Sequence, residues 1–167
     1  MTFLHKNAPS INGEDAQTVD VAWFPYMKST TPEARRFEHV IDDIQNGRWH
    51  NDVARLRTIL AEKGKDVYDQ EKVGLPSFYV SGTASDPKTM LTHSGLIQVD
   101  LDNLSQRLEE ARSQVVTNPY AVAAFTSPSG RGLKVILRLD PLDDPLDKNE
   151  HNTHSPLSQL TSRNATA

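Results

Sequence analysis

Apolar and polar residues follow two different periods along the chain. Between residues 37 and 63, apolar residues recur every three or four positions, which is the period of a helix packed on one face. From residue 77 to residue 139, apolar and polar residues alternate over short runs, which is typical of strands with one buried face. The pattern therefore predicts a helical first part and a second part rich in strands.

The boundaries of these elements follow from residues that start and stop helices. The hydroxyl residues, proline and acid of Ser29–Glu33 predict a helix start, and Asn46–Gly47 predicts the end of that helix. A second helix is expected over residues 51–63, and a third from Leu104 to near Asn118. The expected strands cover residues 19–27, 77–82, 95–102, 121–126 and 133–139.

This order of elements predicts an α+β fold with a mixed or antiparallel sheet and helices on one face. The folded domain is expected over residues 18–140. Residues 1–17 are polar and aperiodic and are predicted to form a flexible lead-in. Residues 141–167 are rich in Asn, Thr and Ser, and we expect a disordered tail or a truncated continuation there.

Composition narrows the possible functions. The formal net charge of −4 argues against bulk binding of nucleic acid through phosphates, but it leaves local binding open. The absence of cysteine excludes disulfides and thiolate metal sites. No apolar stretch is long enough to span a bilayer, so we expect a cytoplasmic protein with no membrane partner.

Two carboxylates on the strand at residues 95–102 are the first candidates for chemistry. Asp100 and Asp102 are two residues apart, so both point away from the core face of that strand. Carboxylates about 7 Å apart suit Mg²⁺ or Mn²⁺, which prefer oxygen ligands. The alternative is that Asp102 or Asn103 caps the following helix and Asp100 is merely exposed. The spacing alone leaves both interpretations open.

The connection at residues 127–132, with Lys134 just after it, is the second candidate. A loop with two serines and two glycines can bring backbone N–H groups close to a phosphate, while Arg131 and Lys134 balance its charge. It is not a Walker A loop, and an ordinary tight hairpin is the alternative. If the strands are neighbours, Asp100, Asp102 and Lys134 share one face, as phosphoryl transfer requires.

Aromatic residues offer a weaker signal. Such side chains can stack on nucleobases, although packing in the core or at a sheet edge is the favoured interpretation here. The residues concerned are Trp23, Phe24, Tyr26, Phe78 and Tyr79.

Three segments in a fixed order carry a resemblance to a known family: residues 75–83, 93–102 and 124–134. Together they resemble the N-terminal domain of VirE-type proteins, which are DNA replication proteins of mobile elements and phages. That domain is similar to the catalytic core of archaeo-eukaryotic primase–polymerases, and the resemblance covers roughly residues 19–140.

The resemblance implies a primase-like nucleotidyltransferase. Asp100 and Asp102 would bind Mg²⁺ or Mn²⁺ and, with Lys134, would be catalytic. The residues implied to contact the nucleotide phosphates are Ser129, Gly130, Arg131 and Lys134. The implied partners are nucleoside triphosphates, a single-stranded DNA template, and a helicase or primase C-terminal domain outside this chain.

A third metal-binding acid is expected in such a core but has no clear place in this sequence. Asp140, Asp143 and Asp144 follow too soon after the last strand to match well. Activity therefore stays open, and we expect binding without efficient polymerisation. One alternative is a non-catalytic module that binds nucleotide or nucleic acid on the same fold. Another is a plain interaction domain.

Overall fold

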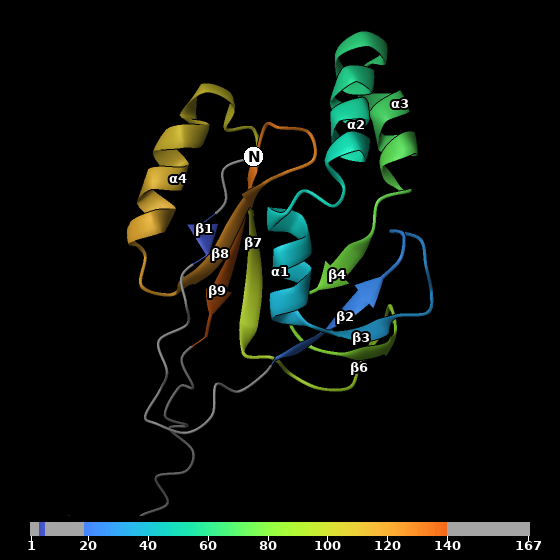
Figure 1. The fold of residues 1–167 in the computed structure, drawn as a ribbon, viewed down its shortest axis with the longest axis vertical. Coiled ribbons are helices and arrows are strands. Elements are labelled where there is room, and N and C mark those ends of the chain that lie inside the picture. The colour runs from blue at the N-terminus through green and yellow to red at the C-terminus, as the bar shows by residue number, and fades with distance from the viewer. Residues whose placement is uncertain (1–3, 6–18, 140–167) are drawn as a thin grey trace, which may run out of the picture.

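The computed structural model describes residues 4–5 and 19–139, which form three antiparallel sheets and four α-helices (Figure 1). The predicted α+β class is confirmed. The strands are β1 (Leu4–His5), β2 (Asp20–Phe24), β3 (Glu33–Arg36), β4 (Ser77–Tyr79), β5 (Ala84–Asp86), β6 (Thr89–Met90), β7 (Leu96–Leu101), β8 (Ala121–Thr126) and β9 (Leu133–Arg138). The helices are α1 (Phe37–Gln45), α2 (His50–Lys63), α3 (Lys65–Lys72) and α4 (Leu108–Thr117), with a short 3₁₀ helix at Ser105–Arg107.

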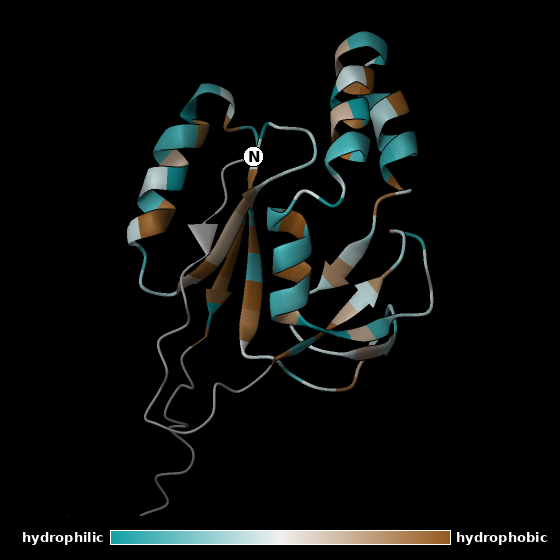
Figure 2. Ribbon diagram, viewed as in Figure 1, coloured by the Kyte–Doolittle hydropathy of each residue, from teal (hydrophilic) through white to brown (hydrophobic). Residues whose placement is uncertain are grey.

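The largest sheet has the strand order β1-β8-β9-β7. β8 and β9 form a hairpin, and β9 also pairs with β7 along its whole length. In Figure 2, β8 and β9 are mostly hydrophobic, whereas α2 and α3 carry many hydrophilic residues. All six residues of β8 are buried, so the centre of this sheet must be covered on both faces.

Helices cover both faces of this sheet, which corrects the sequence-based prediction of helices on one face. On one face, Leu104, Leu108 and Val115 of the α4 region pack against Leu133 and Val135. The opposite face packs against α1 and β2. That second cluster contains Val21, Trp23, Phe37, Val40, Ile41, Leu96, Phe125 and Ile136.

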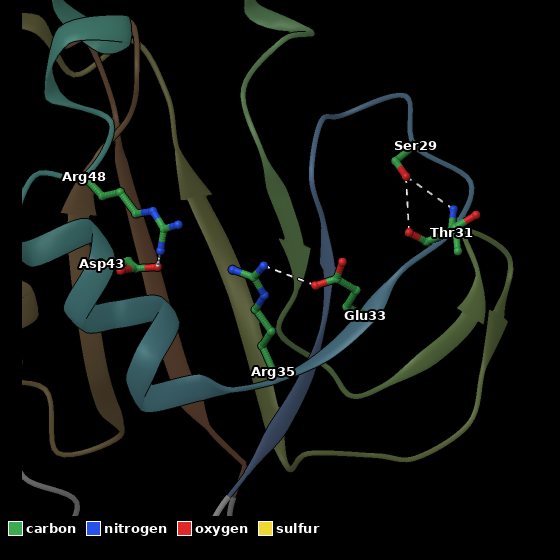
Figure 3. A network of polar contacts seen from close by, with 6 residues as sticks. All are labelled: Ser29, Thr31, Glu33, Arg35, Asp43 and Arg48. Carbon is green, nitrogen blue, oxygen red and sulfur yellow. Dashed lines mark hydrogen bonds and ion pairs between the residues drawn. The ribbon is translucent and has the colours of Figure 1, made fainter.

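The second sheet has the order β3-β2-β4 and corrects the predicted helix start at Ser29–Glu33. Glu33 begins a strand that pairs with β2, and the helix starts only at Phe37. Ser29 uses its hydroxyl to close the turn before this strand. Its Oγ donates to the carbonyl of Thr31 at 3.2 Å and accepts from the Thr31 N–H at 3.3 Å (Figure 3). The residues that resemble a helix cap therefore serve a strand connection.

The second predicted helix is confirmed as α2, but α3 was not predicted. Gly64, with φ of 81°, separates the two helices. Most α3 residues are charged or polar, and only Tyr68 is buried, so no apolar period is visible in so short a helix. Tyr68 packs with Leu56 and Leu75 in a small separate cluster. The β5–β6 hairpin was missed for a similar reason, because its strands are short.

The structure describes little of the two predicted terminal segments. Leu4–His5, inside the predicted lead-in, form β1 and pair with β8. The predicted tail at 141–167 lies outside the described residues, as do Asp140, Asp143 and Asp144. No helix in the described ranges is long and apolar enough to cross a membrane.

Gly82 provides a test of how tightly the segment before β7 is packed. Its φ is 153°, and an added Cβ would lie 1.8 Å from the carbonyl oxygen of Thr92. We expect Gly82→Ala to lower the free energy of unfolding by on the order of 5 kcal/mol, because the clash with the Thr92 backbone adds to the conformational penalty. Urea-induced unfolding measures this change.

Gly64→Ala is the matched control. Gly64 also has a positive φ, but nothing lies within 4 Å of the added Cβ. Its φ of 81° and ψ of −178° still lie in a region almost restricted to glycine, so a conformational penalty of about 2 kcal/mol is expected without any clash. Equal effects at both glycines would contradict the close approach of Gly82 to Thr92.

Candidate functional site

Asp100 and Lys134 are direct cross-strand partners on β7 and β9. The Lys134 Nζ donates to Asp100 Oδ2 at 2.7 Å, and Gln98 Nε2 donates to Asp100 Oδ1 at 2.8 Å. The structure thus brings together Asp100 and Lys134, as strand parity predicts, and adds Gln98. With 44% of the Asp100 side chain and 26% of the Lys134 side chain exposed, the pair adds little stability. Both side chains therefore remain available to a ligand.

Asp102 lies one residue beyond the end of β7 and is exposed. It sits beside Gly132, where an added Cβ would lie 3.3 Å from Asp102 Oδ1 and 2.7 Å from the Leu101 carbonyl oxygen. The described side chains include no cap for α4 or for the 3₁₀ helix before it. The alternative role of Asp102 or Asn103 as a helix cap therefore has no support.

The loop at residues 127–132 uses its own polar groups to form the turn. The Gly130 N–H donates to the Ser127 carbonyl, the Gly132 N–H to Ser127 Oγ, and the Arg131 N–H to Ser129 Oγ. Gly130 has φ of 77°, which favours glycine. Ser129 and Gly130 thus have structural tasks. Three of its backbone N–H groups are thus bonded within the turn, and the phosphate contacts predicted for residues 129–131 and Lys134 stay predictions.

Arg57 on α2 holds this loop, and sequence patterning did not single it out for that task. Its Nε donates to the carbonyl of Pro128 at 3.1 Å, and its NH2 group donates to the carbonyl of Ser127 at 3.3 Å. The guanidinium also lies 3.3 Å from where a Cβ of Gly130 would stand. On the sequence Arg57 is one of several exposed cations on a helix, and nothing there signals a contact about 70 residues away.

An apolar cavity of about 210 Å³ opens beside the Asp100–Lys134 pair. We call it the aromatic cavity, because Trp23, Trp49, Phe78 and Phe125 line it. Lys134 and Gln98, the two residues bonded to Asp100, also line it. The remaining lining residues are Met27, Ile44, Gly47, His50, Val53, Lys72, Leu75, Pro76, Ser77, Thr126 and Pro128.

The aromatic residues noted in the sequence divide into two groups. Trp23 and Phe78 line the aromatic cavity, and Trp23 is 5% exposed. Phe24 is buried and packs against Tyr79 with ring centroids 4.7 Å apart. Tyr26 and Tyr79 are exposed. Trp49 and Phe125 were not singled out, because their approach to Trp23 and Phe78 depends on how the α1–α2 connection and β8 pack against the second sheet.

The predicted metal ligands Asp100 and Asp102 do not form a free binding site for a divalent ion in this conformation. The described ranges contain no group of three or more His, Asp or Glu side chains placed to hold a metal. The Asp100 oxygens are already bonded to Lys134 and Gln98. An ion at Asp100 would therefore have to displace the Lys134 ammonium, with Asp102 as the other predicted ligand.

The geometry defines an α+β domain with a lysine–carboxylate pair at the wall of an aromatic cavity. The sequence matches the family described as BT4734-like, N-terminal domain, over residues 70–161. This match covers more than half of the chain, which therefore belongs to the BT4734-like N-terminal domain family. Neither the curated proteins nor the solved structures include a match.

This result overturns the resemblance to VirE-type N-terminal domains and primase–polymerase cores, which was wrong as a family assignment. The motifs behind it have local structural explanations. Asp100 pairs with Lys134 across two strands, and the Ser–Gly–Arg–Gly segment forms a hairpin turn. The helicase or primase partner was implied only by that resemblance.

Arg57 allows the attachment of the loop to be tested. We expect Arg57→Met to lower the free energy of unfolding by about 1–2 kcal/mol, because two carbonyls lose a charged donor. Amide hydrogen exchange within residues 127–132 should also become faster. Chemical unfolding and exchange measured by mass spectrometry would show both effects.

Arg55→Met, two residues earlier on the same helix, is the control. Arg55 is exposed and bonded only through a surface ion pair with Glu71 at 2.8 Å, so a change of at most about 0.5 kcal/mol is expected. The loop should exchange as in the wild type. If Arg57→Met left loop exchange unchanged, the contact between α2 and the hairpin would be ruled out in solution.

Proposed function

We propose that this domain binds a nucleoside triphosphate together with Mg²⁺ or Mn²⁺, in a site of the nucleotidyltransferase type. The observation that carries the proposal is the Asp100–Lys134 ion pair at the wall of the aromatic cavity. An apolar cavity with a few charged groups at one wall is the usual form of a small-molecule site. A nucleotide has the matching parts, namely a flat base and a charged phosphate chain.

An exchange of partners would let the ion pair accept a metal–nucleotide complex. The Lys134 ammonium would turn from Asp100 to a phosphate oxygen, and the Asp100 carboxylate would turn to the metal ion. Both charges remain paired after the exchange, so neither is left uncompensated. The metal ion would neutralise charge on the phosphates and polarise them for transfer. Asp102 and Arg131, at the adjacent loop, are the further candidates for metal and phosphate contact.

The aromatic cavity suits the base rather than the whole nucleotide. Its volume of about 210 Å³ lies below the range of about 300–1,000 Å³ typical of pockets that enclose entire ligands. A base stacked on the half-buried Trp49 would leave its triphosphate outside, toward Lys134. Stacking is available to every base, so we expect little discrimination among them.

A second candidate is a non-catalytic module that binds nucleotide or nucleic acid. It is favoured by the absence of a three-carboxylate cluster from residues 4–5 and 19–139. Phosphoryl transfer needs metal ions held in fixed positions, and two acids hold an ion loosely. As a nucleotidyltransferase, the domain would act in the cytoplasm on a single-stranded DNA template. As a non-catalytic module, it would only bind a nucleotide or a nucleic-acid strand.

The metal site is tested by calorimetry with Mn²⁺. The wild type should bind with an affinity of about millimolar, because two carboxylates leave most of the coordination to water. Asp100→Asn combined with Asp102→Asn should abolish binding. Lys134→Met should instead strengthen it severalfold, because the cation that competes for Asp100 is gone. Equal Mn²⁺ binding by the wild type and the double variant would exclude these residues as ligands.

Lys134→Met should weaken nucleotide binding, whereas it should strengthen Mn²⁺ binding. Both tryptophans of the chain line the aromatic cavity, so tryptophan quenching by ATP with Mg²⁺ reports on the site. We expect Lys134→Met to weaken ATP binding about tenfold, since a charged hydrogen bond to phosphate is lost. Incorporation of labelled nucleotides into primers should remain undetectable.

Lys88→Met is the control for this measurement. Lys88 is exposed between β5 and β6 and does not line the aromatic cavity, so its loss should leave quenching by ATP unchanged. Equal weakening by both lysine variants would remove Lys134 from the phosphate site. Robust primer synthesis that depends on Asp100 would favour the enzyme over the binding module.

A further inference from the structure

We propose that a second cavity, lined by arginines, binds the phosphates of a single-stranded nucleic acid beside the aromatic cavity. This arginine cavity has a volume of about 540 Å³ and lies between β3, α1 and the α1–α2 connection. Arg35, Arg36, His39 and Arg48 line it, together with Asp20 and Asp43. Three guanidinium groups gather here, and their three carboxylate partners, Asp20, Asp43 and the neighbouring Glu33, balance their charge, so a ligand would depend on the N–H donors that these ion pairs leave unused.

Each arginine has one carboxylate partner and keeps donors for another ligand. Arg48 bonds Asp43 at 2.7 Å and Arg35 bonds Glu33 at 3.1 Å, as Figure 3 shows. Arg36 lies 3.5 Å from Asp20. A guanidinium has five N–H donors, and these side chains are 34–59% exposed. A phosphate can therefore be bound without breaking the existing ion pairs.

A pair of tryptophans joins this cavity to the aromatic cavity. The Arg35 guanidinium lies 4.5 Å from the ring centroid of Trp23, and that of Arg48 lies 5.7 Å from Trp49. The two indoles themselves have centroids 5.4 Å apart. Both indoles line the aromatic cavity, whereas the arginines that cover them line the arginine cavity.

This arrangement fits a single strand better than a free anion. A single-stranded nucleic acid carries phosphates and unpaired bases next to each other along its length. Proteins bind it by combining cationic side chains for the backbone with aromatic rings for the bases. Here the cations and rings are in direct contact. The identity of the base site rests on the proposed function, but the arginine site requires neither Asp100 nor a metal ion.

The test is fluorescence anisotropy with a labelled oligothymidylate of about twelve nucleotides, in the absence of divalent metal and free nucleotide. The wild type should bind with a slope of log K against log salt of about −2, as three phosphate contacts would give. The double variant Arg35→Gln, Arg48→Gln should bind at least tenfold more weakly. Its slope should fall in magnitude by about 1.4, because two contacts are lost.

The double variant Arg55→Gln, Arg107→Gln is the matched control. It removes the same charge and two surface ion pairs, with Glu71 and Glu110, outside the arginine cavity. Its affinity should stay within twofold of the wild type. Circular dichroism checks the folding of every variant. Arg48→Glu alone leaves the contact of Arg35 with Trp23 in place and should also abolish most binding.

Three results would overturn the proposal: no oligonucleotide binding by the wild type, equal losses in the two double variants, or loss of oligonucleotide binding in Asp100→Asn. Failure of the metal and ATP experiments alone would leave it standing, because the oligonucleotide is measured without either. Loss of oligonucleotide binding in Asp100→Asn would show that the strand lies beside Asp100, at the aromatic cavity. In that case the arginines would not be the binding site.

Discussion

The pairing of β9 with β8 on one side and β7 on the other is the interaction on which the rest of the structure depends. β9 is central, and its alternate residues face opposite layers. Leu133 and Val135 pack toward α4, while Ile136, fully buried, packs toward α1 and β2. The same pairing sets Lys134 opposite Asp100 and carries the loop that Arg57 holds. Core and candidate site are thus built on one strand.

The candidate site combines residues inside the family match with residues that precede it in the chain. The family match at residues 70–161 contains Asp100, Lys134 and the β8–β9 loop. Trp23, Trp49 and the arginines beside them precede that match. They reach the site because β2 and α1 cover the sheet face that carries Asp100 and Lys134. The ligand chemistry proposed here therefore needs both parts folded together, because each part supplies charged groups as well as aromatic rings.

The wrong helix start at Ser29–Glu33 and the wrong family resemblance share one physical cause. Polar residues such as Ser29, Ser127 and Ser129 can bond to nearby backbone in several ways, and the sequence does not tell which backbone that is. Ser29 closes a strand connection rather than starting a helix, and the loop serines bond within their own turn. The same ambiguity produced a family resemblance from short motifs, which the match to BT4734-like N-terminal domains overturned.

The local alternation and helical period of apolar residues were enough to predict the strands at residues 95–102, 121–126 and 133–139 and the helix at 51–63. They also predicted that Asp100 and Lys134 lie on the same side of the sheet. Each of these follows from the requirement that an element bury one face. Tertiary structure alone decided that Glu33–Arg36 would pair as a strand, that helices would cover both sheet faces, and that Arg57 would reach Pro128. It also decided that Trp23 and Trp49 would meet, with arginines over them. Such contacts join residues far apart in the chain, and their free energy comes from shared burial and pairing that no local window of sequence contains.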